Sequence, residues 1–191
     1  AGAAEWLEKM VEDQVSPDVP TFTTVIKSCV RAGNVTSARK WLDWMVADDL
    51  EPDAGAYNLV LGAYGRRGDL EAATALFERM TDSLGQQPER AQESFEHMLT
   101  ACAKAGSPVS AEQWLARMQE ADIRPTFRAV SCVVRSHAAA GDPGRTSAWL
   151  ERLAEVPPGS DRRPLKQTMQ AALGLFERVG HQPLLARWAA W

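Results

Sequence analysis

Apolar residues recur along this chain in one phrase that appears once in the opening segment, at Trp6, Leu7 and Met10, and four more times after it. The phrase is an apolar pair followed three positions later by Met or Leu, and the four later pairs are Trp41–Leu42, Leu76–Phe77, Trp114–Leu115 and Trp149–Leu150. Spacings of three and four residues place such side chains on one face of an α-helix. Each phrase therefore predicts a helix with one buried face.

A second helical pattern precedes each of the four later phrases, and a glycine separates the two. The separating glycines are Gly33, Gly68, Gly106, Gly141 and Gly180, with a period of 35 residues and three or four extra residues in the second and fourth intervals. Glycine ends a helix where a left-handed cap is needed. Each period thus predicts a helical hairpin, and since one hairpin cannot bury its apolar face alone, we expect the hairpins to stack.

These boundaries divide the chain into repeats of one continuous solenoid domain. We expect the second half of a truncated repeat (1–18), a first repeat (19–53), a second repeat with an insertion (54–91), a third repeat (92–126), a degenerate fourth repeat (127–165), and a C-terminal half-repeat and cap (166–191). The final phrase, "PLLARWAAW", is interpreted as a capping helix.

The repeats resemble those of the pentatricopeptide repeat family more closely than the 34-residue tetratricopeptide repeats. "CVRAG", "AYGRRG" and "ACAKAG" match the middle of the family's 35-residue unit, "LFERM" and "WLARM" match its second helix, and the Pro-Asp pairs at 17–18 and 52–53 match its end. The resemblance implies an all-α, right-handed α-solenoid without strands. It also implies a plastid or mitochondrial location, reached through a transit peptide that the chain does not contain.

The composition and the absence of known motifs limit the classes of protein to which this chain can belong. The 191 residues are 45% hydrophobic and 24% charged, which is typical of a globular protein, and no apolar run is long enough for a transmembrane segment. We find no nucleotide-binding, zinc-protease or nucleophile motif, so we expect no enzyme activity, no cofactor and no metal. Cys29, Cys102 and Cys132 show no metal spacing and are expected to be buried, reduced thiols. The start, "AGAAEWLEKM", is expected to belong to a processed form or a fragment.

Charge is distributed unevenly between the two kinds of helix. The formal net charge is −4, yet the predicted first helices sum to +6 and the predicted second helices to −10. First helices line the concave surface in the resembled fold, so an acidic chain could contain a basic groove suited to phosphates. Arg31, Arg66 and Lys104 occupy one repeat position and are candidate phosphate contacts. The alternative is that they complement the helix dipole at the ends of the first helices.

The resemblance also implies that single-stranded RNA, and not DNA, is bound one base per repeat. In the family, the fifth and last residues of a unit set the base and the second packs against it. The candidate base-facing residues by that rule are Thr23, Asp53, Asn58, Ser131, Asp161 and Arg128. Thr23 with Asp53 fits the rule best, as a guanine-favouring pair, although Asp53 could instead cap the next helix.

Half of the four repeats are irregular by this rule, and the third departs from it most clearly. In the third repeat the fifth and last residues are Glu96 and Thr126, and a carboxylate that faced RNA would repel it. The alternative function is therefore a protein scaffold, a non-catalytic subunit of a large organellar complex such as a ribosome, in which nothing reads bases. Trp44 and Trp191 are the candidate contacts to other protein subunits.

Overall fold

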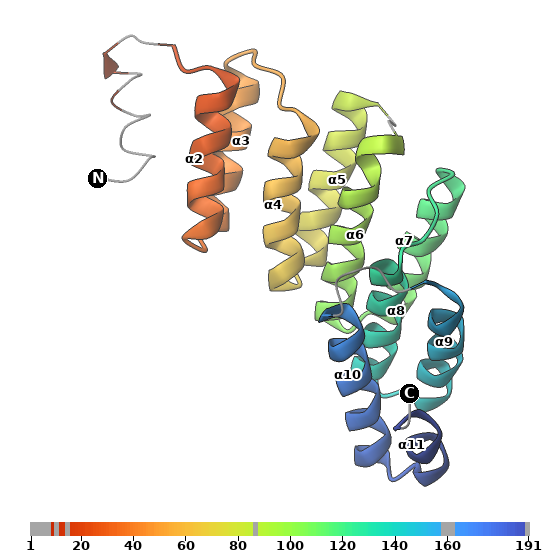
Figure 1. Cartoon of the computed structure of the whole chain (residues 1–191). Coiled ribbons are helices and arrows are strands. Elements are labelled where there is room, and N and C mark those ends of the chain that lie inside the picture. The colour runs from red at the N-terminus through yellow and green to blue at the C-terminus, as the bar shows by residue number, and fades with distance from the viewer. Residues whose placement is uncertain (1–8, 10–11, 14–15, 86–87, 158–162, 190–191) are drawn as a thin grey trace. The chain divides into compact units, whose positions relative to one another are not determined.

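The computed structural model describes residues 9, 12–13, 16–85, 88–157 and 163–189 (Figure 1), and over these ranges it contains helices and turns but no strand. The helices are α2 (Val19–Arg31), α3 (Val35–Ala47), α4 (Ala54–Arg67), α5 (Leu70–Leu84), α6 (Pro88–Ala105), α7 (Pro108–Glu120), α8 (Phe127–Ala140), α9 (Pro143–Glu155), α10 (Arg163–Val179) and α11 (Gln182–Trp188). The predicted all-α fold of repeated helical hairpins is confirmed.

The periodic glycines lie in the turns between the two helices of each hairpin. All five of them have a positive φ, between 65° and 83°. This left-handed region is unfavourable for residues with a Cβ atom, which explains why glycine marks the period. At Gly141, for example, the backbone turns out of α8 before Asp142 caps α9 by accepting a hydrogen bond from the Arg145 N–H at 2.9 Å.

The sequence predicts one continuous domain, whereas the contacts group the chain into two compact units. Unit 1 comprises residues 1–64 and 71–87, and unit 2 comprises residues 65–70 and 88–191. In unit 1, α2 packs against α3, and the Phe22 and Trp41 rings lie 6.4 Å apart between their centroids. The predicted apolar phrase is buried here, because Leu42 and Met45 expose none of their surface.

Unit 2 contains three hairpins whose first helices follow one another. Helix α8 packs against both α6 and α10, and α7, α9 and α11 return beside them (Figure 1). The core at the C-terminal end includes Val134, Leu150 and Leu175, and Trp188 of α11 packs into it with only 6% of its surface exposed. The Trp188 Nε1–H donates to Ser147 Oγ at 3.0 Å and so attaches α11 to α9. That the final phrase caps the solenoid stays a prediction.

Two first helices are longer than the sequence pattern indicates. Helix α6 has 18 residues and begins at Pro88, four residues before the expected start of the third repeat at Gln92. Proline is well suited to the first position of a helix, where its missing N–H is not needed. The inserted residues therefore extend the helix rather than forming only a loop. Helix α10 likewise begins at Arg163.

The three cysteines are buried and free, as predicted. Burial, with a smaller contribution from the neighbouring Cys132, raises the pKa of the Cys102 thiol to about 12, so the thiol is uncharged at neutral pH. No group of His, Cys, Asp or Glu side chains within the described ranges is arranged to hold a metal ion. None of the helices in the part of the chain that the structure describes could cross a membrane.

Candidate nucleic-acid interface

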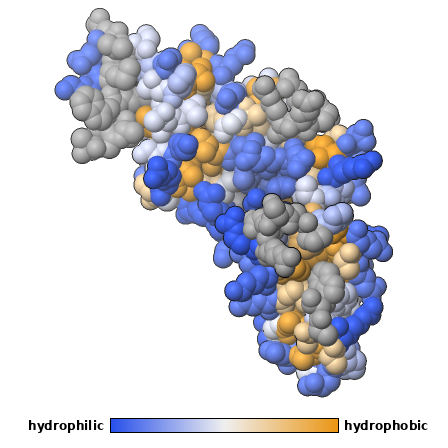
Figure 2. Space-filling view, in the orientation of Figure 1, coloured by the Kyte–Doolittle hydropathy of each residue, from blue (hydrophilic) through white to orange (hydrophobic). Residues whose placement is uncertain are grey.

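A groove of about 560 Å³ lies in unit 2, along the first helices of successive repeats. Four cations line it, one from each of α4, α6, α8 and α10: Arg66, Lys104, Arg135 and Arg178. The other described residues of its lining are six Gly or Ala residues together with Thr100, Gln170 and Leu175, so no carboxylate among the described side chains contributes. We call this surface the basic groove. Figure 2 shows strongly hydrophilic side chains along the edge of unit 2 that carries α10.

Three of the four cations occupy the repeat position that the sequence singled out. Arg66, Lys104 and Arg178 each lie two residues before a periodic glycine, in the last turn of a first helix. Arg178 is not among the phosphate contacts predicted from the sequence, although its position two residues before Gly180 identifies it. Arg31 holds the same position in unit 1, at the exposed end of α2.

The fourth cation comes from a different position. Ala139 stands where the fourth repeat should carry the cation, and Arg135 lies one helical turn before it. The period could not have indicated Arg135, because only the packing of α8 between α6 and α10 brings this side chain into the groove.

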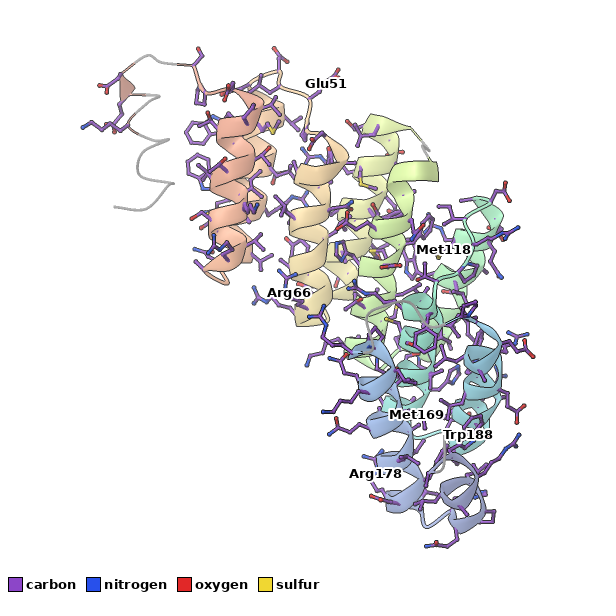
Figure 3. All side chains as sticks on the ribbon, in the orientation of Figure 1. Glu51, Arg66, Met118, Met169, Arg178 and Trp188 are labelled. Atoms are coloured by element: carbon purple, nitrogen blue, oxygen red, sulfur yellow. The ribbon has the colours of Figure 1, made fainter. Side chains whose placement is uncertain are left out.

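The cations differ in how they are held. Arg66, Lys104 and Arg178 are exposed and take part in none of the ion pairs among the described side chains (Figure 3, where Arg66 and Arg178 are labelled). Arg135 is half-buried, and its guanidinium donates to Gln167 Oε1 at 3.3 Å and to Cys132 Sγ at 3.0 Å. The groove thus offers three unpaired cations and one that is already fixed in position.

Small residues keep the groove open and its helices close. A Cβ atom on Gly65 would lie 2.8 Å from the backbone oxygen of His97, so only glycine lets the last turn of α4 approach α6 this closely. A Cβ atom on Gly174 would meet nothing within 4 Å, so this part of α10 faces open space. Because little side-chain bulk fills the groove, a chain of phosphates could approach the four cations.

The predicted base-facing residues of unit 1 make local hydrogen bonds. The Thr23 hydroxyl donates to the Val19 carbonyl at 2.8 Å, and the Asp53 carboxylate accepts from the Ala56 N–H at 2.8 Å. The second bond is that of a helix N-cap, so the alternative role considered for Asp53 is present. Asn58 is mostly buried, with 7% of its surface exposed.

In unit 2, the predicted base-facing residue Ser131 is buried, and the predicted base-facing residue Arg128 lies beside a carboxylate. Ser131 exposes none of its surface, because α8 is packed between α6 and α10, so its hydroxyl is not accessible. Arg128 is half-exposed, and its Nη1 lies 3.6 Å from Glu96 Oε2. The Thr126 hydroxyl donates to the other oxygen of Glu96 at 2.7 Å. The Glu96 carboxylate is thus bonded to Thr126 and lies beside the positive charge of Arg128, which reduces its repulsion of RNA.

The remaining predicted contacts are two tryptophans and one carboxylate. Trp44 is half-buried and stacks on Trp41, with 5.0 Å between ring centroids and 12° between ring planes. Its role as a contact to another subunit stays a prediction. Asp161 and Trp191 lie outside the described residues.

Comparisons with known proteins agree with this geometry. The family model of the pentatricopeptide repeat domain matches residues 5–67 and 93–131, and that of the PPR repeat matches residues 55–83. No curated protein sequence matches the chain.

Several solved structures share its fold. The pentatricopeptide repeat protein PPR10 in complex with an 18-nt psaJ RNA element has a TM-score of 0.75 at 18% identity, covering 98% of this chain and 26% of that one. PPR10 from maize has a TM-score of 0.67 at 21% identity, with coverages of 97% and 25%. The PPR domain of Arabidopsis thaliana protein-only RNase P 1 in complex with tRNA has 0.64 at 14% identity, with coverages of 86% and 83%. The present chain thus spans about a quarter of the PPR10 chain.

Proposed function

The chain belongs to the pentatricopeptide repeat family, and from that premise we propose that it binds single-stranded RNA through the basic groove. The observation that carries the proposal is the lining of the groove, whose described residues bring four cations and no carboxylate together in a chain whose net charge is −4. Two of the similar structures, those of PPR10 and of the RNase P domain, were determined with RNA bound.

The chemistry of the four cations suits a phosphate backbone. Guanidinium groups such as those of Arg66 and Arg178 can bond two phosphate oxygens at once, and Lys104 supplies a compact charge. Each phosphate that they neutralise releases condensed counterions, which favours binding and makes it depend on salt. One cation per successive repeat matches a ligand whose negative charges recur along its length.

Arg66 and Arg67 provide a matched pair that tests the proposal. Both side chains are exposed and lie in the last turn of α4, so both complement the helix dipole, but only Arg66 lines the groove. We expect Arg66→Gln to weaken binding of a mixed-sequence single-stranded RNA several-fold. It should also flatten the dependence of log affinity on log salt by about 0.7, the slope for one phosphate on a single strand.

Arg67→Gln should leave the RNA affinity and its salt dependence nearly unchanged, while costing a similar amount of stability, about 0.3–1 kcal/mol. Fluorescence anisotropy over a series of salt concentrations measures the affinities, and thermal melting measures the stabilities. Equal losses of affinity in the two variants would show that the cations serve the helix dipole alone, and would refute the proposed RNA site.

We also propose that the protein acts in a plastid or mitochondrion, in RNA processing, stability or translation. Family membership supports this proposal. Fractionation of cells that express the full-length protein, followed by RNA crosslinking in the isolated organelles, tests both parts. Recovery of the protein outside organelles would contradict the location, and crosslinks to protein subunits alone would favour the scaffold.

A further inference from the structure

In the third repeat, the side chains at the expected base-reading positions are held by one another. Thr126 has a single hydroxyl proton and donates it to Glu96 Oε1 at 2.7 Å, while its oxygen accepts the Ala129 N–H at 3.2 Å. Arg128 Nη1 lies 3.6 Å from Glu96 Oε2, and the Glu96 side chain is only 14% exposed. The carboxylate and the hydroxyl thus already have protein partners and are poorly placed to bond a base edge.

In the fourth repeat, the side chain at the fifth position is buried. Ser131 exposes none of its surface, so no base could reach its hydroxyl without displacing α8 from between its neighbours. Its repeat nevertheless contributes Arg135 to the groove, and the bonds to Gln167 and Cys132 hold that cation in place. Among its described residues, this repeat therefore presents a groove cation but no accessible side chain at its fifth position, and its last residue, Asp161, lies outside the described residues.

The lining of the groove also contains few uncharged groups that could recognise a base. Among the residues that the structure describes, no aromatic ring lines it, and its uncharged part is mainly Gly and Ala. Base recognition on single strands relies on stacking against rings or guanidinium planes and on hydrogen bonds to base edges. Gln170 of α10 also lines the groove, and its amide is able to contact a base. Among the groove-lining residues that the structure describes in the third and fourth repeats, Thr100 is the one uncharged side chain with a hydrogen-bonding group, and its hydroxyl already donates to the Glu96 carbonyl at 2.7 Å.

Resting on the proposal that the basic groove is the RNA site, we infer that the third and fourth repeats hold RNA by its phosphate backbone and do not discriminate among bases. Lys104 and Arg135 are the cations that these repeats contribute to the groove. The bound strand passes them with its phosphates toward the groove, and its bases there contribute little to affinity.

Two kinds of substituted RNA separate backbone contacts from base contacts. A methylphosphonate removes the charge of one phosphate, and an abasic nucleotide removes one base but keeps its phosphate. Each is moved along a single-stranded RNA and tested against the full chain, Lys104→Gln and Arg135→Gln. A methylphosphonate should weaken binding to the unsubstituted chain at each phosphate that the groove contacts. Where this effect is lost in Lys104→Gln or in Arg135→Gln, the nucleotide faces the repeat of that residue. Arg124→Gln, which removes an exposed cation outside the groove, is the control.

At these nucleotides we expect an abasic substitution to change the dissociation constant by less than about twofold, whereas loss of a stacked base would weaken binding about tenfold. A tenfold loss there would overturn the inference and leave RNA binding by the groove intact. Failure of the unsubstituted chain to bind any single-stranded RNA, or binding that does not weaken with salt, would instead overturn the proposed function.

Discussion

Asp53 caps a helix in the structure and is predicted from the sequence to read a base, and a single substitution can separate these two roles. Its carboxylate accepts a hydrogen bond from the Ala56 N–H and so caps α4, and it is also the last residue of the first repeat. Asparagine caps helices as well as aspartate does. Its amide, however, presents both a donor and an acceptor, whereas the carboxylate only accepts.

Asp53→Asn is therefore expected to leave stability unchanged and to shift base preference. The carboxylate can accept from the guanine N1 and N2 donors, which adenine lacks, so the variant should move the preference at one nucleotide from guanine toward adenine. The shift should be about 1–3 kcal/mol if the value for a bidentate contact on DNA carries over. Anisotropy with two RNAs that differ by one guanine-to-adenine change measures it. Asp142→Asn, at the cap of α9, is the control. Unchanged discrimination would leave Asp53 as a helix cap alone.

At the scale of helices, Glu112 joins α7 to the next hairpin. Its Oε1 lies 3.0 Å from His137 Nε2 on α8 and accepts from the Trp149 Nε1–H at 3.0 Å and from Arg145 Nη1 at 3.1 Å on α9. Burial tends to raise the pKa of this carboxyl. The hydrogen bonds from Trp149 and His137, with the charges of His137 and Arg145, outweigh that effect and lower the pKa below 4.5.

This shift gives stability a defined dependence on pH. A carboxyl whose pKa is lower in the folded state stabilises the fold above its unfolded pKa, and this contribution is lost as the pH falls through the folded value. The original chain should therefore lose stability more steeply below 4.5 than Glu112→Gln does, while being the more stable of the two at neutral pH. Urea denaturation across this range measures the difference, with exposed Glu120→Gln on the same helix as control. Parallel pH profiles for the chain and Glu112→Gln would contradict the role of Glu112.

At the scale of the whole molecule, each compact unit has a core of its own. Leu42 in unit 1 and Leu150 in unit 2 stand at the same position of their repeats, and neither exposes any surface. In repeat proteins stability is carried mainly by contacts within a hairpin and with its neighbours. A cavity in one unit should therefore act locally.

Leu150→Ala and Leu42→Ala test this locality as a reciprocal pair. Each should cost about 2–5 kcal/mol, the usual range for a leucine removed from a core. Leu150→Ala should lower hydrogen-exchange protection in α8, α9 and α10 while α2 and α3 keep theirs, and Leu42→Ala should give the reverse pattern. A uniform loss of protection along the chain in either variant would show that the protein unfolds as a single cooperative body.

The repeats could be predicted from the sequence because their signals are local. A helical hairpin is encoded by apolar residues three and four apart, by a glycine at the turn, and by proline or a capping residue at the next start. The position two residues before that glycine likewise indicated Arg66 and Lys104, and extended with the same register it indicates Arg178. Local spacing thus identifies the fold and three of the four cations of the groove.

The packing of neighbouring helices decides which side chains line the groove. Ser131 has the sequence position of a base-facing residue but is buried, and Arg135 lies off the cation register but reaches the groove. The pairing of Glu96 with Thr126 and Arg128 joins residues 30 or more positions apart. A period reports where a side chain stands on its own helix, whereas its exposure and partners depend on the distance and rotation of the next helix. The side chains packed between helices set those quantities, and they vary from repeat to repeat.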